Sequence, residues 1–230
     1  MSHVLAALLH FTSIVFLAVG ALLPIVEPLG GAPIYLAMTA GLSAEQSKRM
    51  ARAVAINSFL LLLASALIGA YVLDFFGLSI PAVQVAGGIV VCAIAWSLLN
   101  SPNTPPALDR GDLSTATPEY LGQRAFYPMT MPLTVGPGSI SVALTLGANP
   151  PPGFRSLLMT ALAHTVGIFL VAVSVYLCDR FARQILRKLG PTGTSVVMRL
   201  SAFILLCIGV QLAWNGIHAL VAAGFRLSST

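Results

Sequence analysis

The sequence PIVEPLGGAP, residues 24–33, cannot continue the apolar helix that precedes it. It follows an apolar run that begins at about Leu5, and it holds three prolines in ten residues. Proline removes a backbone donor and clashes with the preceding turn, so we expect the helix to break here. A second stretch, PMTMPLTVGPGSI at 128–140, is predicted to break in the same way. A shift of 104 positions places Pro24, Pro28, Leu29 and Pro33 on Pro128, Pro132, Leu133 and Pro137.

The composition places this chain in a membrane. Of its 230 residues, 57% are hydrophobic and 8% are charged, whereas a typical soluble domain carries about 25% charged residues. A spanning helix needs about 20 apolar residues. Six such runs are present, at about 5–26, 51–73, 80–99, 126–147, 156–178 and 195–222. Because the alternating strands of a membrane barrel are absent, we predict an all-helical membrane protein with six transmembrane helices.

The two broken stretches divide the chain into related halves. We predict a first three-helix repeat at 1–100, a cytoplasmic linker at 101–125 and a second repeat at 126–230. At a looser shift of 108 positions, Asn57 falls on Thr165. Because each half has three helices, an odd number, the second half lies in the membrane in the opposite orientation to the first. The broken helix is the first helix of each half. This pattern is typical of inverted-repeat transporters.

The basic residues predict the orientation. With six spans, Arg155 and Arg226 fall on one side of the membrane and all other Lys and Arg residues on the opposite side. The larger group is Lys48, Arg49, Arg52, Arg110, Arg124, Arg180, Arg183, Arg187, Lys188 and Arg199. Cytoplasmic loops carry the excess of Lys and Arg, so both termini are predicted to be periplasmic. The run 180–188, which follows Asp179, is expected to face cytosol and lipid headgroups rather than nucleic acid.

The broken segments also predict a binding site. Non-helical backbone at membrane depth is tolerated where it is buried in protein or lines an aqueous cavity. The ends of half-helices offer amide groups to an anion and carbonyl groups to a cation, and an amino acid zwitterion carries both charges. The alternative is that the breaks are kinks that serve packing. The predicted substrate-binding residues are Glu27, Pro28, Leu29, Gly30, Gly31, Asn57, Thr130, Thr134, Gly136, Pro137, Gly138 and Thr165.

Glu27 is the only acidic residue that the predicted spans place inside the membrane. Ionisable groups there mark substrate pathways, proton relays or counter-charges. We therefore expect Glu27 to bind the ammonium group of a substrate or to bind and release a proton. The alternative is that Glu27 lies at the membrane–water interface, at the end of its helix. Asn57 and Thr165 either face the site or form hydrogen bonds between helices. Gly87 and Gly88 are predicted to form a helix-packing face.

Motifs of soluble enzymes are missing from the sequence. HExxH, GxSxG, a phosphate-binding GxxxxGK and a strand-linked GxGxxG are all absent, so we predict neither an enzyme nor a bound cofactor. The three cysteines, Cys92, Cys178 and Cys207, have no CxxC spacing. This argues against a disulfide framework and against a metal site.

At the two broken motifs the chain resembles the MarC family of bacterial inner-membrane proteins. The resemblance rests on EPLGGAPIYL at 27–36, AGGI at 86–89 and PLTVGPGSI at 132–140, and it extends over about 5–217. It implies a six-span inner-membrane transporter of a small solute, such as glycine, alanine or another neutral amino acid. The expected function is transport that is coupled to H⁺ or Na⁺ or that runs as export. Membrane lipid is the expected surrounding, and whether the protein forms a homo-oligomer is left open. Family members usually carry Asp or Asn where this chain has Glu27.

Two other functions fit the same residues. A channel, or an exporter of another metabolite, would also place its pathway at the breaks. A membrane scaffold would use the breaks only as packing kinks. Saturable counterflow separates a carrier from a channel, and tight co-purification with a partner would favour the scaffold.

Overall fold

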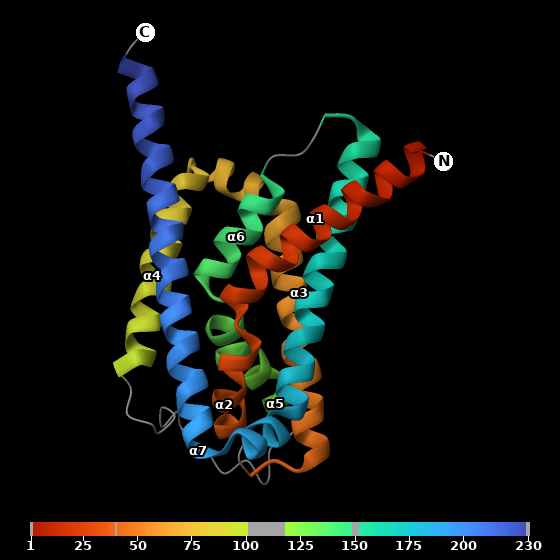
Figure 1. Ribbon diagram of the computed structural model, residues 1–230, viewed down its shortest axis with the longest axis vertical. Helices are drawn as coiled ribbons and strands as arrows, with labels where there is room; N and C mark the ends of the chain where they lie inside the picture. Colours follow the sequence, from red (N-terminus) through yellow and green to blue (C-terminus); the bar gives the residue numbers. More distant parts are fainter. Residues whose placement is uncertain (1, 40, 101–117, 149–151, 229–230) are drawn as a thin grey trace.

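The computed structural model describes residues 2–39, 41–100, 118–148 and 152–228, and every element in these ranges is a helix (Figure 1). Both chain ends lie at the same end of the molecule, and the connection between α2 and α3 lies at the opposite end. The all-helical prediction is confirmed for these residues. In order, the elements are α1 (Ser2–Val26), α2 (Pro28–Met38), α3 (Ala44–Phe75), α4 (Ile80–Asn100), α5 (Pro118–Arg124), the π-helical segment η2 (Ala125–Thr134), α6 (Pro137–Gly147) and α7 (Phe154–Ser228).

Within the part of the chain that the structure describes, five helices are long and apolar enough to cross a membrane. They are Ala7–Leu36, Ala44–Gly69, Ile80–Asn100, Phe154–Gly190 and Thr192–Ala222. The predicted fourth span, 126–147, is instead the irregular η2 followed by α6, a shorter apolar helix. The six-span inverted repeat therefore stays a prediction, as do the domain limits. Most of the expected linker, at 101–117, lies outside the described residues, and its last part forms α5.

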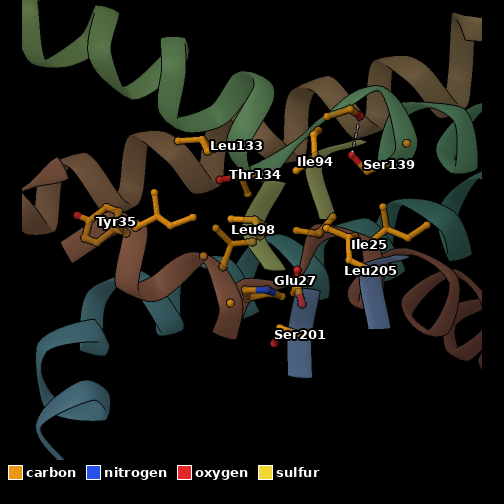
Figure 2. A pocket seen from close by; sticks show the side chains of 18 of the residues that line it. Ile25, Glu27, Tyr35, Ile94, Leu98, Leu133, Thr134, Ser139, Ser201 and Leu205 are labelled. Atoms are coloured by element: carbon orange, nitrogen blue, oxygen red, sulfur yellow. Dashed lines mark hydrogen bonds between the residues drawn. The ribbon is translucent and has the colours of Figure 1, made fainter. Parts of the chain in front are cut away.

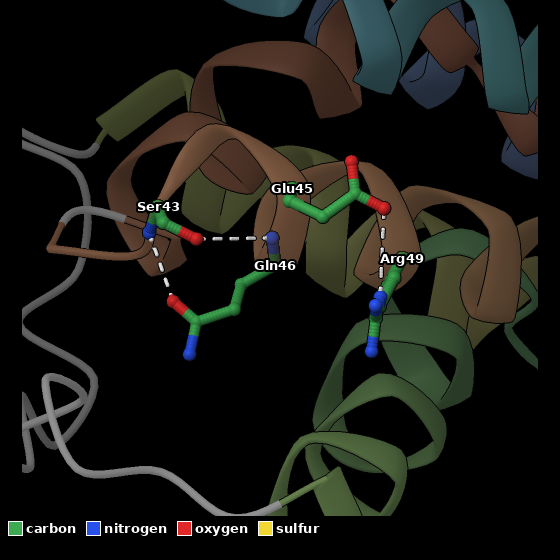
Figure 3. A network of polar contacts seen from close by, with 4 residues as sticks. All are labelled: Ser43, Glu45, Gln46 and Arg49. Atoms are coloured by element: carbon green, nitrogen blue, oxygen red, sulfur yellow. Dashed lines mark hydrogen bonds and ion pairs between the residues drawn. The ribbon is translucent and has the colours of Figure 1, made fainter.

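Helix α3 begins at Ala44, seven residues before the predicted start of its apolar run. Ser43 and Gln46 form a capping box: the Ser43 hydroxyl accepts from the Gln46 amide at 3.2 Å, and the Gln46 side chain accepts from the Ser43 amide at 2.9 Å (Figure 3). In the first turn, Glu45 forms an exposed ion pair with Arg49 at 3.5 Å. The Ser-x-x-Gln spacing is a known helix-start signal, and it explains why α3 begins before the apolar run.

Helix α7 contains the predicted break between the fifth and sixth runs. The break falls between Cys178 and Ser195, as expected, and lies at Gly190, with helix on both sides of it. Gly190 has φ 67° and ψ 177°, a conformation that is essentially confined to glycine. The basic side chains of 180–188 lie exposed on the outside of the helix, where long stems cover apolar surface while the charges meet water.

Gly190→Ala should therefore lower thermal stability. A side chain at this backbone conformation costs about 1–3 kcal/mol, which corresponds to a fall in Tm of roughly 2–12 °C for a chain of this length. Thermal unfolding in detergent measures this shift. Gly122→Ala is the control, since its added Cβ meets nothing within 4 Å and its φ is ordinary. Equal Tm values for the two variants would contradict the role of Gly190.

The buried side chains form two separate groups. The larger group joins α1, α3 and the first limb of α7 through residues such as Leu22, Leu62 and Ile168. The smaller group, Val91, Ala95 and Leu205, joins α4 to the second limb of α7, residues 192–222. Figure 1 shows this limb running beside α4, away from α1 and α3. The protein thus has one main bundle and one helix pair packed against it.

Candidate functional site

The first break lies at Glu27, between α1 and α2. Glu27 has φ 51°, in the left-handed region, and it turns the chain without any loop. Its amide still donates to the Leu23 carbonyl, and its carbonyl accepts from the Gly31 amide, both at 3.0 Å. The predicted break is therefore confirmed but narrower than expected, because Pro24 lies inside α1 and Pro33 inside α2.

The second break lies between η2 and α6, at Val135 and Gly136. Both residues are extended, and α6 begins at Pro137 with no side-chain cap. The Ser139 hydroxyl donates to the Gly136 carbonyl at 3.0 Å, and the first helical bond of α6 runs from the Ile140 amide to Gly136. The backbone amides of the first turn come before this bond, and, as in every helix, they have no carbonyl partner within the helix. This second break thus presents a helix N-terminus, as α2 does at the first break.

Both breaks border one cavity of about 190 Å³ (Figure 2). Its wall is mostly apolar, with contributions from α1 to α4, η2, α6 and both limbs of α7. The structure brings Glu27, Pro28, Gly30, Gly31, Thr134, Gly136, Pro137 and Gly138 of the predicted site residues to this wall. The residues of the first break are 103 or more positions away from those of the second break, and the fold brings the two related segments to the same cavity.

The other predicted site residues lie outside this lining. Leu29 is 56% exposed on the outer side of α2. Thr130 is fully buried, and its hydroxyl donates to the Ala125 carbonyl at 2.7 Å. Thr165 donates to Ala161 at 2.8 Å within its own helix, and Asn57 is partly buried on α3. The structure therefore does not bring Asn57 and Thr165 to the cavity, although they align between the halves.

Glu27 is held against the second limb of α7. Its carboxylate accepts a hydrogen bond from the Ser201 side chain, and Figure 2 shows the two residues next to each other. A Cβ at Gly30 would lie 3.0 Å from the Glu27 carboxyl carbon and 3.2 Å from the Ser201 Cβ. Gly30 therefore leaves the room that the Glu27 side chain needs to fold back over the start of α2.

Asp179 is a second acidic residue on the same cavity wall, and sequence reasoning did not include it among the site residues. It lies within the spanning helix Phe154–Gly190 and is only 7% exposed. We had placed it at the start of a cytoplasmic basic run. Val171, Val175, Asp179 and Ala182 are all buried at a helical spacing, and this periodicity was the signal for an inward-facing position.

Tyr35 on α2 is a further polar residue of the wall that sequence reasoning missed. Its hydroxyl donates to the Ser47 carbonyl, which ties α2 to the first turn of α3. Within the described residues, no group of three or more His, Cys, Asp or Glu side chains is placed to hold a metal ion. The cavity therefore offers carboxyl, hydroxyl and backbone groups to a ligand.

The sequence pattern of MarC family integral membrane proteins matches residues 11–221. The chain belongs to the MarC family. It is 29% identical over 206 residues to the UPF0056 inner membrane protein MarC of Escherichia coli strain UTI89, and 28% identical over 205 residues to that of Salmonella typhimurium strain LT2. Each alignment covers 87% of this chain and 92% of the relative. No solved structure matches the chain.

Membership of the MarC family makes this chain an integral inner-membrane protein with several spanning helices. The family resemblance inferred from the two broken motifs is thereby confirmed. The names of the MarC relatives state neither a substrate nor an enzymatic activity.

Proposed function

We propose that this MarC-family protein is a secondary transporter of a small zwitterionic solute, a neutral amino acid, and that the solute binds in the cavity between the two breaks. The observation that carries the proposal is that both broken segments, far apart in sequence, line a single cavity. Transporters build their sites in this way from discontinuous helices near the bilayer midplane.

The chemistry of the cavity fits a zwitterion. Helix N-termini favour negative charge, and α2 and α6 both begin at the cavity, at Pro28 and Pro137. These ends suit a substrate carboxylate, while Glu27 suits an ammonium group. The volume of about 190 Å³ is smaller than the roughly 300–1,000 Å³ of sites for drug-sized ligands, which favours a small solute.

The packing supports alternating access. One wall of the cavity comes from the helix pair, with Val91 and Leu98 on α4 and Leu205 on α7. The facing wall comes from the main bundle, with Val54 and Val175. The pair formed by α4 and the second limb of α7 has its own small cluster of buried hydrophobic residues. It can therefore move as a rigid body against the main bundle while the core of the bundle stays closed. Rigid-body motion of this kind underlies many transport cycles.

Reconstituted protein should take up labelled glycine, alanine or serine in a saturable manner. The measurement is uptake into proteoliposomes, followed by counterflow from vesicles preloaded with the same solute. Counterflow separates a carrier from a channel, because only a carrier couples the two directions through one site. Absence of both flux and binding across a broad panel of small solutes would remove the proposal.

Gly31→Leu should abolish this flux while leaving the fold intact. Gly31 lines the cavity, and a Cβ there meets nothing within 4 Å, so the backbone tolerates a side chain, and we expect the larger Leu to take up ligand space. Leu also favours a helix over Gly by up to about 1 kcal/mol, so Tm should not fall. Gly20→Leu is the matched control, since Gly20 is equally open but lies exposed on α1, outside the cavity wall. Full flux in Gly31→Leu would show that substrate passes elsewhere.

A further inference from the structure

The proposed zwitterion site uses Glu27 and the two helix ends, and it leaves Asp179 without a role. Asp179 lines the cavity from the first limb of α7 and is 7% exposed. Among the described residues it forms neither an ion pair nor a side-chain hydrogen bond. An unpaired carboxylate in an apolar wall is costly unless it binds a proton or meets a cation. Its position therefore indicates a cationic ligand.

The groups around Asp179 do not supply that partner. From the other elements of the cavity, the titratable side chains that face it are Glu27 at the break and Tyr35 on α2. The Tyr35 hydroxyl is already engaged, because it donates to the Ser47 carbonyl. The lining residues from α3, α4, η2, α6 and the second limb of α7 carry no titratable side chain.

The neighbours of Asp179 on its own helix do not pair with it either. Arg180 is exposed and its guanidinium lies 5.8 Å from the centre of the Phe181 ring. Arg183, one turn further on, is also exposed and forms no ion pair with Asp179. Cys178 lies beside it in the chain and is partly buried. The carboxyl group is thus left open toward the cavity.

We propose that Asp179 carries the proton whose movement drives solute transport, so that the coupling ion is H⁺ and not Na⁺. A metal cation needs several oxygen ligands, and within the described residues no group of three or more His, Cys, Asp or Glu side chains is placed to supply them. A proton needs only the carboxylate. In the step, hydronium and the Asp179 carboxylate give the carboxylic acid and water on one side of the membrane, and the reverse reaction follows on the other side.

This inference rests on the proposed function, and one experiment separates the two. Proteoliposomes are loaded with the pH dye pyranine, and labelled solute uptake is followed under pH gradients of both polarities and under a Na⁺ gradient. For the wild-type protein we expect a pH gradient of one polarity to drive accumulation and the solute to move protons by itself. Asp179→Asn should lose gradient-driven accumulation and solute-induced proton movement, yet retain counterflow, which also proves that the variant is folded.

The controls distinguish proton carriage from a structural role. Asp179→Glu keeps a carboxyl group and should restore coupling, and Asp74→Asn makes the same change at an exposed acid of α3 without effect. Arg183→Gln should also leave coupling intact, which excludes a hidden ion pair. Accumulation driven by Na⁺ alone, or coupled accumulation in Asp179→Asn, would overturn the inference while the transport function stands. Absence of counterflow in the wild-type protein would overturn both.

Discussion

Glu27→Gln will reduce solute flux by about 2- to 30-fold, because a charge-assisted hydrogen bond contributes about 1.5–3 kcal/mol where its neutral counterpart contributes about 1 kcal/mol. Glu27 is the carboxylate at the first break, on the cavity wall and beside the start of α2. Gln has the same shape and can still accept from Ser201, so the local packing is kept. What the variant loses is the negative charge that faces a substrate ammonium. The measurement is initial uptake and counterflow in proteoliposomes.

The matched control is Glu45→Gln, the same change at an exposed residue of the first turn of α3. Its ion pair with Arg49 is solvent-exposed, and such pairs contribute about 0–1 kcal/mol, so flux should not change. Glu27→Asp retains the charge with a shorter reach, and we expect flux between that of the wild-type protein and Glu27→Gln. If Glu27→Gln carries solute at the wild-type rate, Glu27 has no part in the mechanism.

Gly88→Leu will separate α4 from the second limb of α7 and destabilise the protein. A Cβ at Gly88 would lie 2.5 Å from the Ala213 nitrogen and 2.6 Å from the Gly209 carbonyl oxygen. These are backbone atoms that cannot rotate away, so the helices must move apart. Small residues that let helices approach closely are a main source of packing energy in membranes. Overpacking costs about 1–3 kcal/mol or more, a fall in Tm of roughly 2–12 °C.

Thermal unfolding in detergent tests this prediction, with Gly20→Leu as the control on an open face of α1. Gly209→Leu, on the facing helix, should give a similar loss, because its Cβ would lie 2.9 Å from the Cys92 nitrogen. Unchanged Tm values in both variants would mean that the close packing of this helix pair is not needed for stability.

Several features of the fold and site could be predicted because they act locally. Pro28 and Pro137 have no amide hydrogen to continue a preceding helix, and the breaks do lie directly before them, at Glu27 and at Gly136. The packing role of Gly88 was likewise predicted and is confirmed by its contact with α7. The position of the turn between the last two runs, at Gly190, was not predicted, because the apolar pattern ends at Cys178 while the helix continues beyond it.

The sequence by itself determined that the chain lies in lipid, that it is helical and where two of its segments break, since composition and proline positions need no distant contacts. Only the tertiary structure decided which side chains share the cavity. It left Asn57 and Thr165 outside and turned Asp179 inward, beside residues from the other half of the chain. The physical reason is that the direction of a side chain on a membrane helix depends on which neighbours the helix meets, and these neighbours are distant in sequence.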